Sequence, residues 1–197
     1  MKKTLINIRG AGASGKTTAV KQFCERRGFS VERVETPFSI LPISVIDGGK
    51  ITVFGDYSAN GKCLGADRYK NGKRDIQDAM IECARIYNSD FIIYEHMMTS
   101  HTFKGTKEIA EVARAFGYEY LGIQIFVSEE ERLRRLRERS GENAGTKNFN
   151  ANNLQRVERT SKMLNEAGIR VVPFNVENID KCDMWKVVEY GIRQAME

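Results

Sequence analysis

One glycine-rich segment near the start of the chain has the residue types and spacing that bind phosphate. Residues 10–17 read Gly-Ala-Gly-Ala-Ser-Gly-Lys-Thr, which fits the G-x-x-x-x-G-K-[ST] pattern of phosphate-binding loops. In such a loop, backbone amides converge on phosphate oxygens, and the helix that follows adds its positive dipole end. We expect contacts to a nucleoside triphosphate from Gly12, Ala13, Ser14, Gly15, Lys16, Thr17 and Thr18.

Two side chains of this segment have individual roles in the prediction. Lys16 is expected to reach the β- and γ-phosphates and to act in catalysis, and the Thr17 hydroxyl is expected to help hold Mg²⁺. The alternative is a glycine-rich turn with an unrelated lysine. The D-x-x-G and N-K-x-D motifs of GTPase switches are not found in suitable places, which argues against such a switch. For a kinase, we expect ATP and Mg²⁺ as the cofactors. The segment does not identify the acceptor.

An arginine-rich segment in the second half of the chain is the next candidate for phosphate binding. Arg132, Arg135 and Arg139 are three and four residues apart, so they lie on neighbouring turns of one helix. A planar guanidinium spans phosphate oxygens and stays charged, and we expect contacts first from Arg135 and Arg139. The alternative is a solvated helix face on which these arginines pair with Glu129, Glu130, Glu131 and Glu138.

Phosphoryl transfer also needs a carboxylate that positions the acceptor or a magnesium-bound water. Glu95 ends a predicted buried strand, at the edge where open α/β sheets place their sites, and it is also a candidate Mg²⁺ ligand. Asp67 lies in a long loop, and either Asp67 or Glu95 is expected to orient the acceptor hydroxyl. Asp56, in the same loop, is a candidate contact to the acceptor. The alternatives are a loop aspartate that caps a turn and a strand-end carboxylate that pairs with a lysine.

Further residues around the long loop are candidates for acceptor binding. His101 follows the Glu95 strand closely, whereas His96 is expected to be structural. Tyr57 and Phe103 (with Tyr69) are candidates to stack on an acceptor base, although single loop aromatics also fill local cores. A basic rim that would follow a polyanion, or would only keep the chain soluble, consists of Lys62, Arg68, Lys70, Lys73 and Arg74.

Short β-rich runs alternate with longer helical windows, which predicts an α/β fold. We expect a three-layer, P-loop kinase-like arrangement with a mainly parallel sheet, helices on both faces, a β-hairpin insertion and a mobile lid. The predicted strands are 5–8, 30–34, 43–46, 51–54, 91–94, 121–127 and 169–174. The predicted helices are 15–27, 74–88, 106–116, 129–139, 153–167 and 183–195. The acceptor-side loop covers about 55–73 and the lid about 128–152, with Ser128 and Glu131 as a capping box.

Composition fits an ordinary globular protein. The chain has 197 residues, of which 41% are hydrophobic and 29% charged, and 31 Lys+Arg against 26 Asp+Glu give a net charge of +5. These values predict one domain over 1–197 and exclude a disordered chain. A membrane-spanning run and a signal peptide are not expected, so we predict a cytoplasmic protein with reduced cysteines. The basic balance permits a polyanionic partner.

Several segments, taken in order, resemble one known family. They are Ile6-Asn7-Ile8-Arg9-Gly10, Val53-Phe54-Gly55-Asp56-Tyr57, Gly65-Ala66-Asp67, Ile93-Tyr94-Glu95-His96 with Ser100-His101-Thr102-Phe103, and Asn148-Phe149-Asn150. The order resembles the P-loop 5-hydroxymethyluracil DNA kinases of phages that hypermodify their thymine. The likeness spans most of 5–175, and the glycine-rich loop is its most specific part. Two positions differ from the family pattern: Asp56 replaces a basic residue and His96 a glycine.

The resemblance implies an ATP-dependent kinase that phosphorylates the hydroxymethyl group of a 5-hydroxymethyl-pyrimidine in phage DNA. The base must then leave the stack, or come from a single strand, to bring its hydroxyl in line with the γ-phosphate. The motifs leave other acceptors open: a deoxynucleoside monophosphate or nucleoside kinase, or a polynucleotide 5′-end kinase. An ATP-binding regulatory switch that transfers no phosphate is the alternative that is not an enzyme.

Overall fold

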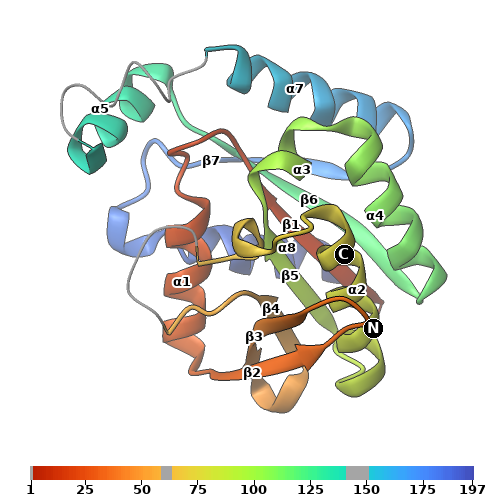
Figure 1. The fold of residues 1–197 in the computed structure, drawn as a ribbon. Helices are drawn as coiled ribbons and strands as arrows, with labels where there is room; N and C mark the ends of the chain where they lie inside the picture. Colours follow the sequence, from red (N-terminus) through yellow and green to blue (C-terminus); the bar gives the residue numbers. More distant parts are fainter. Residues whose placement is uncertain (1, 59–63, 141–150) are drawn as a thin grey trace.

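The computed structural model describes residues 2–58, 64–140 and 151–197. These residues form a seven-stranded sheet in the order β2-β3-β4-β5-β1-β6-β7 (Figure 1). Strands β4, β5, β1, β6 and β7 pair in parallel, whereas β2, β3 and β4 pair antiparallel. The bounds are β1 Lys3–Arg9, β2 Ser30–Glu35, β3 Ile40–Ile46, β4 Ile51–Phe54, β5 Phe91–Glu95, β6 Tyr118–Phe126 and β7 Val171–Asn175.

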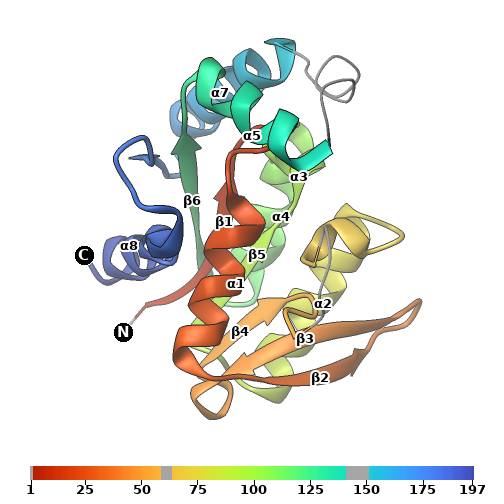
Figure 2. The same ribbon diagram turned by 90° about the vertical axis from the view of Figure 1, so that its left-hand side faces the viewer.

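Helices cover both faces of the sheet (Figures 1 and 2). They are α1 Lys16–Arg27, α2 Lys73–Ile86, α3 Met97–His101, α4 Phe103–Ala115, α5 Glu129–Ser140, α7 Ala151–Glu166 and α8 Lys186–Met196. The protein has a hydrophobic core on each face of the sheet. The side chains of β1 alternate between these two cores, because successive strand side chains point to opposite faces. Leu5 packs with residues of α2, α4 and α7, whereas Ile6 and Ile8 pack with α1 and α8. The expected three-layer α/β fold is therefore confirmed.

The predicted β-hairpin is part of the central sheet. Residues 40–46 and 51–54 pair antiparallel as β3 and β4, and β4 continues in parallel onto β5. Strand β2 pairs with the outer edge of β3, so one end of the sheet is an antiparallel meander. The hairpin thus extends the sheet on the side of β5.

Some predicted boundaries were wrong. Helix α3 was not predicted, and α4 begins at Phe103 and not at 106. The short α3 is too brief to show an amphipathic stripe, and it begins where the His96 side chain accepts a hydrogen bond from the Thr99 amide. Strand β6 begins at Tyr118, three residues before the predicted start at 121.

The register of the parallel strands sets the position of the glycine-rich loop. Ile8 of β1 lies opposite Glu95 of β5 and Ile123 of β6. The carboxyl ends of these neighbouring strands therefore meet at one edge, where open α/β sheets place their ligand sites. The loop that follows β1 begins two residues after Ile8, directly beside Glu95.

The acceptor-side loop closes back on this edge. Gly55 and Gly65 form an isolated antiparallel bridge, and a short 3₁₀ helix, Ala66–Arg68, follows. A Cβ atom on Gly55 would lie 2.2 Å from the Leu64 carbonyl oxygen, and Gly55 has a φ of 122°, so the stem requires glycine here. The stem brings Asp67 back toward the end of β5.

The described residues include no helix that is long and apolar enough to cross a membrane. Cys24, Cys83 and Cys182 are free thiols in the structure. Lys62, Cys63, residues 141–150 of the predicted lid and the side chain of Arg139 lie outside the described part of the chain.

Candidate functional site

The loop between β1 and α1 has backbone conformations that match its glycine pattern. Gly15 has a φ of 97° and precedes the first turn of α1, and Ala13 has a φ of 63°. A Cβ atom on Gly15 would lie 2.7 Å from Met184 Cε and 3.4 Å from an Arg135 nitrogen. The left-handed backbone therefore favours glycine at position 15, and a larger residue would also have to displace the end of the Met184 side chain.

The Lys16 side chain folds back over this loop. Its ammonium donates to the carbonyl oxygens of Gly10 (2.9 Å) and Ala11 (3.1 Å), and the residue is only 7% exposed. A positive charge therefore sits inside the loop before any ligand enters, at the place where converging amides would hold an anion.

Helix α5 lies across the loop (Figures 1 and 2) and contacts it through two arginines. Arg132 is buried, and its Nε donates to the carbonyl oxygen of Gly12 at 3.1 Å. Arg135 donates to the carbonyl oxygen of Ser14 at 3.3 Å and to Glu131 at 2.7 Å. The sequence ranked Arg132 behind Arg135 and Arg139, yet it is the most deeply buried arginine of this helix in the described part of the chain.

Ion pairs along α5 match the alternative weighed for these residues. Arg134 is exposed and pairs with Glu131 and Glu138. Hydrogen bonds from Arg134 and Arg135 lower the pKa of Glu131 to about 2. Because Glu131 is held by arginines, only half of the predicted capping box forms: Ser128 Oγ accepts from the Glu131 amide. The Ser128 amide donates instead to Glu177 at 3.1 Å.

Glu95 lies at the end of β5, buried beside the loop. It is 1% exposed, and its Oε1 accepts a hydrogen bond from the Tyr57 hydroxyl at 3.3 Å. Its Oε2 is buried with no hydrogen-bond partner among the described residues. Burial raises the pKa of Glu95, and the Lys16 ammonium and the Thr17 hydroxyl oppose that shift. A Cβ atom on Gly65 would lie 2.7 Å from Glu95 Cγ, so this glycine lets the loop stem close over the carboxylate.

These oxygens fit a magnesium ion. Mg²⁺ prefers oxygen ligands and usually keeps several waters, so it needs only one or two groups from the protein. The Thr17 hydroxyl lies near the Glu95 carboxylate, whose Oε2 is buried and has no partner among the described residues, and both residues line one cavity beside the glycine-rich loop. The donor set is therefore compatible with Mg²⁺ bound beside the phosphates.

A cavity of about 740 Å³ lies against the loop. Its loop side consists of Gly12, Ala13, Gly15, Lys16, Thr17 and Thr18, and its α5 side includes Glu131, Arg134, Arg135 and Glu138. Glu95 and Asp67 line it from the sheet edge. The remaining wall comes from the segment after β7, with Glu177, Ile179, Lys181 and Met184. We call it the donor cavity.

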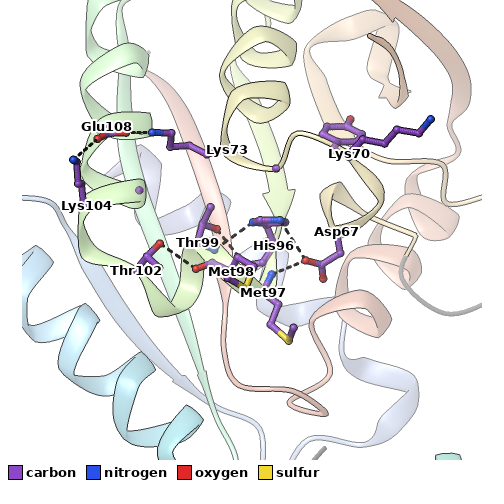
Figure 3. A pocket seen from close by; sticks show the side chains of 13 residues that line it. Asp67, Lys70, Lys73, His96, Met97, Met98, Thr99, Thr102, Lys104 and Glu108 are labelled. Carbon is purple, nitrogen blue, oxygen red and sulfur yellow. Dashed lines mark hydrogen bonds and ion pairs between the residues drawn. The ribbon is translucent and has the colours of Figure 1, made fainter. Parts of the chain in front are cut away.

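Figure 3 shows the residues that line a second cavity, of about 880 Å³. It adjoins the first, because the two cavities share lining residues. Asp67 and Met97 line both cavities. The other lining residues come from the acceptor-side loop and from helices α2 to α4: Tyr69, Lys70, Gly72, Lys73, His96, Met98, Thr99, Thr102, Lys104, Gly105 and Glu108. Two spaces therefore meet at one carboxylate.

Asp67 is held in place at this junction. Its Oδ1 accepts a hydrogen bond from the Met97 amide at 2.8 Å and lies 3.6 Å from His96 Nε2 (Figure 3). His96 Nδ1 accepts from the Thr99 amide at 3.2 Å, so a neutral His96 carries its proton on Nε2, facing Asp67. Burial and the nearby Lys16 lower the pKa of His96, although Asp67 opposes the shift. His96 was expected to be structural, and here it also forms part of the second cavity.

No protein-family model matches the chain, and no curated protein matches it. Solved structures with similarity over most of the chain include a de novo designed protein of P-loop NTPase fold, at 12% identity and a TM-score of 0.45, covering 98% of this chain and 92% of that one. Another, from the PezAT chromosomal toxin-antitoxin system of Streptococcus pneumoniae, has 13% identity and a TM-score of 0.45, covering 99% and 87%.

A third structure is an ADP ribosylation factor-like GTP-binding protein, the small COPII coat GTPase SAR1 of Encephalitozoon cuniculi in complex with GDP. It has 13% identity and a TM-score of 0.35, covering 98% of this chain and 81% of that one. Likenesses this distant carry no argument about function. The fold rests on the sheet, and the strand, glycine-rich loop and helix of residues 3–27 form a P-loop.

Several predicted acceptor residues lie away from both cavities in the described part of the chain. Asp56 accepts hydrogen bonds from the amide and hydroxyl of Ser58, which is the turn-capping alternative. Tyr57 is 1% exposed in the core beside the P-loop, so its ring is not presented for stacking, and Phe103 is partly buried against the other core and lines neither cavity. His101 and Arg68 line neither cavity.

The basic rim divides in a similar way. Lys70 and Lys73 line the second cavity, whereas the guanidinium of Arg74 lies 3.4 Å from the centre of the Phe38 ring. The sequence did not point to Lys104, Met97 or Met98, which line the same cavity. It also did not point to the segment after β7, although its position after the carboxyl end of a parallel strand was a usable signal.

Proposed function

We propose that the protein is an ATP- and Mg²⁺-dependent phosphotransferase. Its proposed acceptor is the hydroxymethyl group of 5-hydroxymethyluracil, or a related 5-hydroxymethyl-pyrimidine, in DNA. One observation carries the proposal: the donor cavity, which contains the P-loop, meets the second cavity at Asp67. A transferase needs adjacent space for donor and acceptor with a carboxylate between them, whereas a simple nucleotide switch does not. The DNA acceptor rests on the order of motifs along the sequence.

The donor end of the proposed reaction uses the P-loop. Lys16 now bonds to two loop carbonyls, and a bound triphosphate would take over its ammonium and stabilise charge on the transferring group. Arg135, which lines the donor cavity, would contact the phosphates, and Thr17 and Glu95 would hold Mg²⁺. When bound, Mg²⁺ neutralises charge on the triphosphate oxygens.

Asp67 is the proposed general base. The acceptor hydroxyl oxygen forms a bond to the γ-phosphorus, and the bond from that phosphorus to the β–γ bridging oxygen breaks, with its electron pair leaving on ADP. The hydroxyl proton passes to Asp67, which lines both cavities. Glu95 lines only the donor cavity and is 1% exposed, which supports metal binding as its role.

The test is transfer of label from [γ-³²P]ATP to matched DNA duplexes. We expect label in duplex that contains 5-hydroxymethyluracil and none in the same duplex with thymine. Mass spectrometry of the digested product should show the phosphate on the modified nucleoside. Label confined to a free nucleotide, or to a 5′ end, would instead support a nucleotide kinase or an end kinase. ATP binding with no transfer to any of these acceptors would support a regulatory switch.

A further inference from the structure

The floor of the second cavity is an exposed apolar pair. Met97 and Met98 are adjacent residues at the start of α3, with 40% and 57% of their surfaces exposed. Exposed apolar side chains in a polar surround are typical of binding sites. Methionine is flexible and polarisable, so it packs well against flat partners of varied shape. An aromatic ring is a ligand group that suits this floor.

A basic group lies at another side of the same cavity. Lys73 of α2 and Lys104 of α4 both contact the Glu108 carboxylate (Figure 3). Two ammonium groups against one carboxylate leave a net positive charge, and the shared glutamate holds them near each other. The Lys70 side chain points away from this group in Figure 3. The side chains of Lys73 and Lys104 suit an anion such as a phosphate.

The third feature of the second cavity is Asp67, which lies at its junction with the donor cavity. Asp67 uses Oδ1 for the Met97 amide and for the approach of His96. Its Oδ2 has no hydrogen bond within the described ranges, and both cavities reach this residue. A ligand lying on the methionine pair can therefore direct a hydroxyl toward Asp67 and the donor cavity beyond it.

We propose that the second cavity is the acceptor site and that it takes a nucleotide unit, with the base against Met98 and Met97 and its flanking phosphate at Lys73 and Lys104. This assignment rests on the proposed phosphotransfer, because it supplies that reaction with its acceptor. Met98 lines only the second cavity, whereas Met97 lines both. The two methionines therefore have different expected effects on the two substrates.

The first test compares Met98→Ala with Met196→Ala. Met196 is 55% exposed at the end of α8 and lines neither cavity of the described chain, so it controls for loss of a surface methionine. Met98→Ala should raise the acceptor KM about fivefold, because it removes apolar contact with the base, and should leave the KM for ATP within about twofold. Met97→Ala should raise both KM values.

The second test separates the two sources of a nucleotide unit. Binding of a fluorescent oligonucleotide with one 5-hydroxymethyluracil is measured by fluorescence anisotropy at increasing salt concentrations. In a parallel measurement, free 5-hydroxymethyl-deoxyuridine monophosphate is added as a competitor. Lys104→Gln should lower the salt slope of oligonucleotide binding by about 1. If the free monophosphate displaces the oligonucleotide and binds with the same affinity as the oligonucleotide, the acceptor in this cavity is a free nucleotide.

The outcomes distinguish this inference from the proposed function. If no acceptor receives phosphate from ATP, the proposed function fails, and oligonucleotide binding still tests the cavity through Met98→Ala. If transfer occurs but Met98→Ala and Lys104→Gln both behave like Met196→Ala, the reaction stands and the acceptor site is elsewhere. A raised acceptor KM in Met98→Ala with an unchanged KM for ATP supports the assignment.

Discussion

The two adjoining cavities differ in how firmly their walls are held. In the donor cavity, Lys16 and Glu95 are almost fully buried, and Arg135 is bonded to a loop carbonyl. In the second cavity, Met97 and Met98 are largely exposed. Side chains that are already held beside the loop need only exchange a backbone carbonyl for a phosphate oxygen when a ligand binds, which suits a triphosphate of constant shape. An exposed, flexible wall suits an acceptor that arrives with its surroundings attached.

The largest expected effect concerns the carboxylate that the cavities share. Asp67→Asn keeps the shape of the side chain but removes its capacity to accept a proton. We expect kcat to fall by about 10²-fold to 10³-fold, with ATP affinity unchanged within about twofold, measured by label transfer and by calorimetry. Asp56→Asn is the control, because Asp56 only caps a turn at Ser58. Equal losses in both variants would contradict a base at the junction.

A smaller effect should come from the arginine that ties α5 to the P-loop. Arg132→Gln removes the bond from Nε to the Gly12 carbonyl and loosens the donor cavity only. We expect the Kd for ATP to rise about tenfold while oligonucleotide affinity stays the same, since a buried hydrogen bond to a charged group is worth about 1.5–3 kcal/mol. Arg137→Gln, at an exposed position of the same helix that lines neither cavity of the described chain, should leave both affinities unchanged. A weaker oligonucleotide affinity in Arg132→Gln would show that the cavities are not independent.

The smallest expected effect concerns Tyr57, whose hydroxyl connects the acceptor-side loop to Glu95 in the donor cavity. Tyr57→Phe deletes only the hydroxyl that donates to Glu95. We expect the free energy of unfolding, from urea denaturation, to fall by about 1–2 kcal/mol and kcat to fall a few-fold, because Glu95 loses a buried donor. Tyr190→Phe is a suitable control, because this ring packs on Phe174 away from the P-loop. If Tyr57→Phe leaves both the stability and the rate unchanged, the Tyr57 hydroxyl does not support Glu95.

Local pattern predicted much of the frame correctly. The glycine spacing predicted the P-loop because left-handed backbone at Gly15 is a property of that residue type. Segments with the hydrophobic period of a strand alternate with segments that have the period of a helix, and this order predicted the parallel sheet. The period of the hydrophobic residues indicates which face of each segment is buried. Glycines at the ends of α1 and α7, Gly28 and Gly168, also lie where the helices were expected to stop.

The candidate site was predicted less well, because contact between distant segments decides it. Tyr57 and Phe103 were expected to stack on a base, whereas Tyr57 is buried in one core and Phe103 is partly buried against the other, and both cores are assembled by other strands and helices. Arg132 and Arg135 have the same chemistry in the sequence, and only the approach of α5 to the loop decides which carbonyl each one meets. The placement of Asp67 depends on the closure of a loop stem through Gly55 and Gly65.

The sequence by itself determined a glycine-rich loop with the P-loop pattern between a strand and a helix, since that geometry depends on residues next to one another in the chain. Only the tertiary structure decided that this loop faces Glu95, that Asp67 stands where two cavities meet, and that Met97 and Met98 form an exposed floor. The physical reason is that cavities are spaces between elements far apart in the sequence. Their walls follow from sheet register and helix packing, which no short pattern of residues specifies.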